Sequence, residues 1–90
     1  SFFEVLKDEF VNLYNIGKYI EENIYTNSSA AIKESRLFAE KLLINVAEIE
    51  GLYYLKTVPQ YERIRELNKD GIISDKILSE FDFIRITGNT

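Results

Sequence analysis

The 90-residue sequence contains no cysteine, no histidine and no methionine, and it has a single proline. Without cysteine the chain can form neither a disulfide framework nor a thiolate metal site. Without histidine it lacks the usual general base and the commonest nitrogen ligand of zinc. We therefore expect these residues to perform no catalysis and to hold no cofactor of their own. Since methionine is absent even at position 1, we expect either that the initiator has been removed or that this chain is a piece of a larger protein.

Long apolar runs are missing as well, because no stretch approaches the roughly 20 residues that a membrane span requires. No signal-peptide layout is present, so we expect a cytoplasmic protein without a membrane partner. The formal net charge is −4, which disfavours strong DNA binding by this chain, because phosphate contacts depend on Lys and Arg. With 46% hydrophobic residues, the chain can build the core of one domain over residues 1–90.

Apolar residues recur every three or four positions in two long stretches, a spacing typical of amphipathic helices. The first stretch predicts a helix over residues 2–25 with the stripe Phe3, Leu6, Phe10, Leu13, Gly17, Ile20 and Ile24. Gly17 is interpreted as a point where a neighbouring helix comes close. The second predicts a helix over residues 29–50, preceded by the capping triplet Asn27-Ser28-Ser29 and stopped by Gly51. Its stripe comprises Ala31, Phe38, Leu42, Val46 and Ile49, flanked by Ala39, Leu43 and Ala47.

The second half predicts two shorter helices. Residues 52–55 form an aromatic, extended connector, and residues 57–60 provide a capping box with Pro59 in the first turn of a third helix. The expected buried stripe of that helix is Tyr61, Ile64 and Leu67, and its solvated face is Glu62, Arg63, Arg65, Glu66 and Lys69. Ser74 is the expected N-cap of a fourth helix that carries Ile77, Leu78, Phe81 and Ile84. The sequence therefore predicts an all-α, up-and-down four-helix bundle.

Few side chains are candidates for a functional role. Arg36 and Glu40 lie one turn apart, and their spacing permits a solvated ion pair. Alternatively, Glu40 faces Arg85 across the bundle and fixes its guanidinium by a bidentate contact. Arg85 is followed by Gly88 and Asn89, a turn-favouring pair, so these three are further candidate functional residues. The six tyrosines are interpreted as packing at the edge of the core rather than as a base-stacking surface.

Three motifs carry a resemblance to a known family. They are RLFAEKLL at residues 36–43, YERIREL at 61–67 followed by GII at 71–73, and IRITGN at 84–89. Together they resemble a small helical domain of uncharacterised function, found at the N-terminus of R subunits of type I restriction-modification enzymes and of related helicases. That domain is similar to HEPN domains, the four-helix modules of bacterial defence systems, which implies a HEPN-like bundle.

The resemblance implies a non-catalytic accessory or assembly domain. The parent chain would be an ATP-dependent DNA endonuclease and translocase that uses ATP and Mg, and that contacts DNA itself. The implied partners are the remainder of the parent chain and the other restriction-modification subunits, with a homodimer as a further possibility. The alternative is a HEPN-type RNA-acting or nucleotide-binding module, in which Arg85 acts with a His beyond residue 90. A third hypothesis is a scaffold bundle that docks a partner through Phe2, Phe3, Tyr53 and Tyr54.

Overall fold

The computed structural model describes residues 2–23 and 29–88, and this part of the chain is all-helical, with four α-helices and no strand. The helices are α1 (Phe2–Glu22), α2 (Ser29–Ile49), α3 (Gln60–Lys69) and α4 (Asp75–Gly88), and a short 3-10 helix, η1 (Tyr53–Lys56), joins α2 to α3. The predicted all-α class is therefore confirmed for the described residues. The first helix ends three residues earlier than predicted, while Ile24, Asn27 and Ser28 lie outside the described residues.

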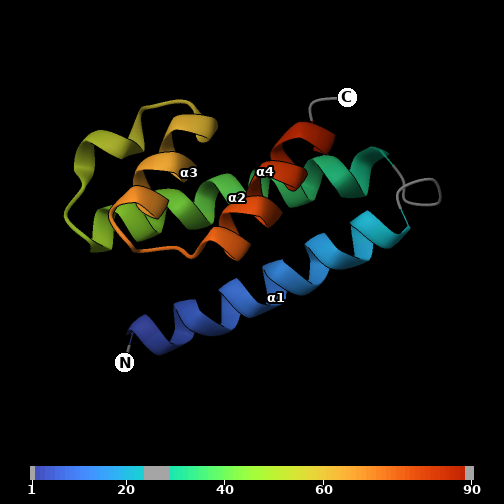
Figure 1. The fold of residues 1–90 in the computed structure, drawn as a ribbon, viewed down its shortest axis with the longest axis horizontal. Coiled ribbons are helices and arrows are strands. Elements are labelled where there is room, and N and C mark those ends of the chain that lie inside the picture. The colour runs from blue at the N-terminus through green and yellow to red at the C-terminus, as the bar shows by residue number, and fades with distance from the viewer. Residues whose placement is uncertain (1, 24–28, 89–90) are drawn as a thin grey trace.

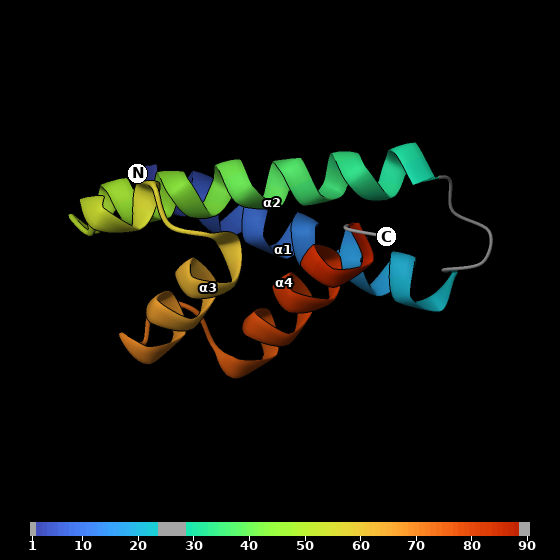
Figure 2. The ribbon, with the colours of Figure 1, turned by 90° about the horizontal axis from the view of Figure 1, so that it is seen from above.

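The two long helices run antiparallel, and α3 and α4 form a second layer across them (Figures 1 and 2). The helix α4 packs against each of α1, α2 and α3, and α2 packs against every other element of the described fold. The core between the layers takes buried side chains from every element, among them Leu13, Leu43, Leu55, Ile64 and Ile84. Phe10 of α1 and Phe81 of α4 meet edge to face, with ring centroids 6.1 Å apart.

Local sequence chemistry sets several helix ends as predicted. Gly51 and Gly71 follow α2 and α3 with φ angles of 75° and 76°, a conformation that glycine adopts without a steric penalty. In each case the next residue donates its backbone N–H to a carbonyl five positions back, which completes a Schellman motif. Ser74 caps α4, because its Oγ accepts a hydrogen bond from the Ile77 amide at 3.2 Å.

The connection between α2 and α3 differs from the prediction. Residues 53–56 form one turn of 3-10 helix instead of an extended segment, and Leu55 within it is fully buried. The predicted capping box is also wrong, because Pro59 is the N-cap of α3 and makes no side-chain cap hydrogen bond. The side chain of Gln60 accepts a hydrogen bond from Arg63 instead. A buried arginine, described below, thus organises this connection.

The predicted buried stripes are shifted in two helices. In α2 the residues Ala39, Leu42, Leu43, Val46 and Ala47 are buried, whereas Ala31, Phe38 and Ile49 are exposed. Since α1, α3, α4 and η1 all contact α2, their positions decide which face of α2 is buried, and that face does not include Phe38. In α3 Tyr61 is exposed, and Arg63 is buried with Ile64 and Leu67. The predicted stripe of α1 is confirmed at Leu13, Gly17 and Ile20.

Candidate functional site

Two of the predicted site residues, Arg36 of α2 and Gly88 of α4, are in direct contact. A Cβ atom built on Gly88 would lie 2.7 Å from Cδ and 2.8 Å from Cβ of Arg36. Real Cβ atoms do not approach other carbon atoms that closely, so a side chain at residue 88 would force Arg36 or the last turn of α4 to shift. The Gly88 of the C-terminal motif therefore permits the last turn of α4 to lie against the arginine of the α2 motif.

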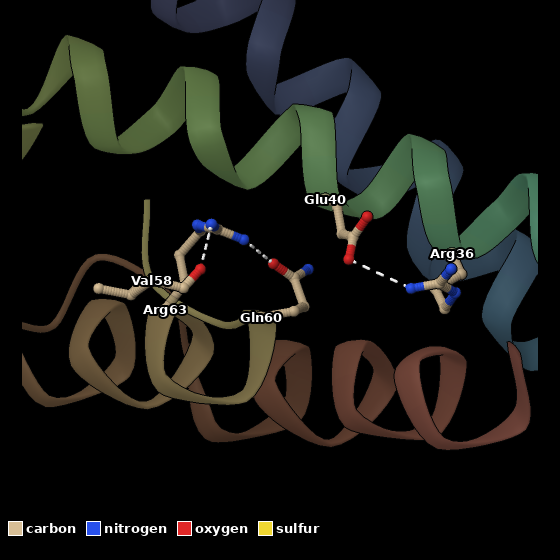
Figure 3. A network of polar contacts seen from close by, with 5 residues as sticks. All are labelled: Arg36, Glu40, Val58, Gln60 and Arg63. Carbon is tan, nitrogen blue, oxygen red and sulfur yellow. Dashed lines mark hydrogen bonds and ion pairs between the residues drawn. The ribbon is translucent and has the colours of Figure 1, made fainter. Parts of the chain in front are cut away.

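Arg36 also pairs with Glu40, as the first sequence interpretation proposed. Its Nη1 donates to Glu40 Oε1 at 3.2 Å, and each side chain is 29% exposed (Figure 3). The Nε of Arg36 is buried and has no hydrogen-bond partner in the described part of the chain. The pair is thus half-buried at the junction of α2 and α4 rather than solvated.

Arg85 does not meet Glu40, so the alternative interpretation is wrong. Its Nε donates to Asp82 Oδ1 at 3.2 Å, and both partners are largely buried. Each of the two carboxylates is already paired with an arginine about one turn away on its own helix, at spacings of three and four residues. Each arginine thus has a carboxylate partner on its own helix, and no hydrogen bond or ion pair joins Arg85 to Glu40 in the described structure. Asn89 lies outside the described residues.

Sequence reasoning missed Arg63, which had been assigned to the solvated face of α3. Only 4% of this residue is exposed, and its guanidinium donates to the Leu55 carbonyl at 2.7 Å. It also donates to the Val58 carbonyl at 2.7 Å and to the side chain of Gln60 (Figure 3). Burial lowers the pKa of Arg63, and the nearby negative charge of Glu40 opposes that change. The guanidinium fork thereby fixes η1 and the start of α3.

The residues Arg36, Glu40, Gln60 and Arg63 form a polar seam between α2 and the layer of α3 and α4 (Figure 3). Each guanidinium in the seam donates to a side chain or a carbonyl of the same protein. No group of three or more His, Cys, Asp or Glu side chains that could hold a metal ion exists among the described residues. The hydrogen bonds of the seam lie within α2, within α3, and between α3 and the segment that precedes it, so they fix the local conformation of these elements.

A second buried charge lies between α1 and α4. Glu80 is 8% exposed, its Oε2 has no hydrogen-bond partner in the described structure, and its Oε1 lies 4.0 Å from Lys18 Nζ. Burial raises the pKa of Glu80, the charge of Glu21 raises it further, and Lys18 and Lys76 lower it. The space for this carboxylate comes from Gly17, so the predicted close approach at Gly17 is confirmed, with a side chain as the neighbour.

The structure also contains an apolar groove that the sequence did not predict. It has a volume of about 330 Å³ and lies between α1, the end of α2 and the start of α4, and we call it the α1–α2–α4 groove. Its lining residues are Lys7, Phe10, Val11, Tyr14, Val46, Ile49, Glu50, Ile72, Lys76 and Ile77. The ammonium of Lys76 lies 4.9 Å from the centroid of the Tyr14 ring, a cation–π contact at the rim.

Comparison with protein-family models, with curated proteins and with solved structures found no match to this chain. The resemblance to the R-subunit domain and to HEPN modules therefore stays a prediction from the three motifs. None of the helices in the described ranges is both long enough and apolar enough to cross a lipid bilayer. The cytoplasmic location likewise stays a prediction.

Proposed function

We propose that this chain is a non-catalytic accessory or assembly domain of a larger polypeptide. The engagement of its arginines supports this proposal. Arg85 is paired with Asp82, Arg36 with Glu40, and Arg63 with backbone carbonyls of η1 and the segment before α3. An arginine that acts on a phosphate needs donors free to reach the substrate. In this domain Arg36 and Arg85 each pair with a carboxylate of their own helix, and Arg63 holds η1 and the start of α3, which favours a structural role for these side chains over a catalytic one.

The proposed setting is a type I restriction-modification enzyme, with this domain in the R subunit. In that setting ATP, Mg and DNA belong to the remainder of the polypeptide, and this domain contacts that remainder or the other subunits. The motifs at residues 36–43 and 84–89 carry this part of the proposal. The contact between Arg36 and Gly88 supports it, because it joins those two motifs in one structural unit.

Deletion of residues 1–90 from the full polypeptide tests the proposal. We expect the deletion to weaken association with the other restriction-modification subunits by about tenfold or more, while ATP hydrolysis by the remainder persists. Sedimentation velocity measures the association, and a full polypeptide with Arg85→Ala is the control that should associate normally. Unchanged association after the deletion would contradict an assembly role.

The RNA-acting alternative makes a different prediction for the same proteins. If it holds, the full polypeptide cleaves single-stranded RNA and the Arg85→Ala variant does not. We expect no difference between the two proteins, because the Arg85 guanidinium is paired with Asp82. RNA cleavage that is lost in the Arg85→Ala variant would contradict the accessory role and support a catalytic one.

A further inference from the structure

The α1–α2–α4 groove presents faces of two helices to the same space. Lys7, Phe10, Val11 and Tyr14 are spaced three, four and seven positions apart, so they share one face of α1. The end of α2 likewise presents Val46, Ile49 and Glu50 on one helix face. The third side of the groove is formed by Ile72 and Ile77. Val11 is 55% exposed and Ile49 is 42% exposed, although both lie beside the core residue Val46 in this groove. The groove therefore exposes apolar side chains of α1 and α2 to solvent, which makes it a candidate docking surface.

The charges at the rim restrict what the groove can bind. Lys7 and Lys76 stand at its edge in a protein whose net charge is −4, and neither forms an ion pair with another described residue. Glu50 contributes one negative charge at the end of α2, so the rim is positive by one charge. A ligand that carries carboxylates beside an apolar stripe complements this pattern.

We propose that the α1–α2–α4 groove binds an amphipathic, acidic α-helix of a partner polypeptide. The apolar stripe of that helix lies between Val11 and Ile49, and its Asp or Glu side chains face Lys7 and Lys76. This inference rests on the proposed accessory function and names the kind of partner that the function requires. A helix fits better than an extended segment, because the lining residues belong to helix faces and no sheet edge exists in the described chain to pair with a strand.

Two matched synthetic peptides test the inference. Each is a helix of about 18 residues with a leucine stripe, long enough to run along the groove. One peptide carries Glu beside the stripe and the other carries Lys at the same positions. Fluorescence anisotropy with this chain measures both affinities at low and high salt. We expect the Glu peptide to bind about tenfold more tightly than the Lys peptide, with the difference shrinking as salt screens the lysines.

A pair of protein variants locates the binding. Val11→Glu places a negative charge in the apolar groove and should weaken binding of the Glu peptide by about tenfold or more, because this charge loses hydration and repels the acidic peptide. Ile86→Glu is the matched control, because Ile86 is also 55% exposed but lies outside the groove, and the affinity of this variant for the Glu peptide should stay within about twofold of the parent. Circular dichroism confirms that both variants are folded before their affinities are compared.

A charge swap completes the test. In the Lys7→Glu/Lys76→Glu variant the preference should reverse, so that the Lys peptide binds more tightly than the Glu peptide. Equal binding of the two peptides, or unchanged binding of the Glu peptide by Val11→Glu, would overturn the inference. Binding of laurate that Val11→Glu abolishes, without peptide binding, would also overturn it and assign the groove to a small apolar anion. If the peptides fail while residues 1–90 still mediate subunit association, the accessory function stands and the partner docks elsewhere.

Discussion

The carboxylate of Glu80 on α4 occupies the space beside Gly17 on α1. A Cβ atom at residue 17 would lie 2.7 Å from Glu80 Oε2 and 3.4 Å from Ile84 Cδ1. A buried carboxylate with an unpaired oxygen is unfavourable, because the charged form loses its hydration. The contact between α1 and α4 is therefore sensitive to the protonation state of one side chain.

Glu80→Gln should stabilise the protein at neutral pH. Burial raises the pKa of Glu80 in the folded state above its value in the unfolded chain. The folded state therefore binds this proton more tightly, so the contribution of Glu80 to stability is fully present below the unfolded pKa of about 4.3 and is lost as pH rises through the raised pKa. Urea unfolding at about pH 4 and pH 7 should show a larger gain for Glu80→Gln at pH 7. The exposed Glu34→Gln serves as control, and a loss of stability in Glu80→Gln at pH 7 would contradict the expectation.

Gly88→Ala should destabilise the fold by about 1–2 kcal/mol, because the added methyl group collides with Arg36. The Cβ of Arg36 is fixed to the α2 backbone and cannot move aside, unlike the end of a flexible side chain. Arg36→Ala removes Cγ and Cδ, so the double variant should lose less stability than the sum of the two single variants. Urea unfolding measures all three, with Ser79→Ala on the exposed face of α4 as the control. Strict additivity would count against a direct contact.

Arg63→Ala should be the most damaging substitution of an arginine in the chain. The substitution removes the hydrogen-bond donor of the Leu55 and Val58 carbonyls, and we expect it to lower the unfolding free energy by about 3 kcal/mol. Arg63→Lys should not restore stability, because an ammonium lacks the planar fork that serves several acceptors. Arg65→Ala, on the exposed side of the same helix, should change the unfolding free energy by less than about 0.5 kcal/mol. If Arg63→Ala and Arg65→Ala lower the unfolding free energy by similar amounts, Arg63 does not fix η1 and the start of α3.

Glu40 should be coupled energetically to Arg36 and not to Arg85. A double-mutant cycle for Arg36 and Glu40 should give a coupling of about 0.3–0.5 kcal/mol, as expected for a half-buried pair one turn apart. The corresponding cycle for Glu40 and Arg85 should give no measurable coupling, because Arg85 is paired with Asp82. Thermal unfolding of the single and double alanine variants supplies both cycles. A larger coupling energy in the cycle for Glu40 and Arg85 would indicate that these two side chains interact across the bundle.

The features predicted from sequence are those that local chemistry decides. Gly51, Gly71 and Ser74 end or begin helices through hydrogen bonds to residues within five positions, so neighbouring residues suffice to place them. The pairing of Arg36 with Glu40 is equally local. The all-α class follows from helical spacing over most of the chain, because each stripe must be buried against another helix.

The missed features depend on how separate elements meet. Arg63 occurs in the same helical register as Ile64 and Leu67, which was a signal of burial, but its charge assigned it to the solvated face. The position of Glu40 relative to Arg85 depends on the crossing of α2 and α4, which neither helix determines alone. The α1–α2–α4 groove combines residues from three regions of the chain, so only the packed structure could reveal it.

Amide hydrogen exchange of the full polypeptide, assembled with its partner subunits, tests most directly whether this domain works by docking. Exchange in residues 7–14, 46–50 and 72–77 is compared with exchange in this chain alone. Since a bound helix suppresses local opening of the elements that it covers, we predict slower exchange in those three segments. If exchange in the groove segments is unchanged in the assembly and slows only at the end of α4 around Arg85, docking in the groove is contradicted and the partner binds near Arg85 instead.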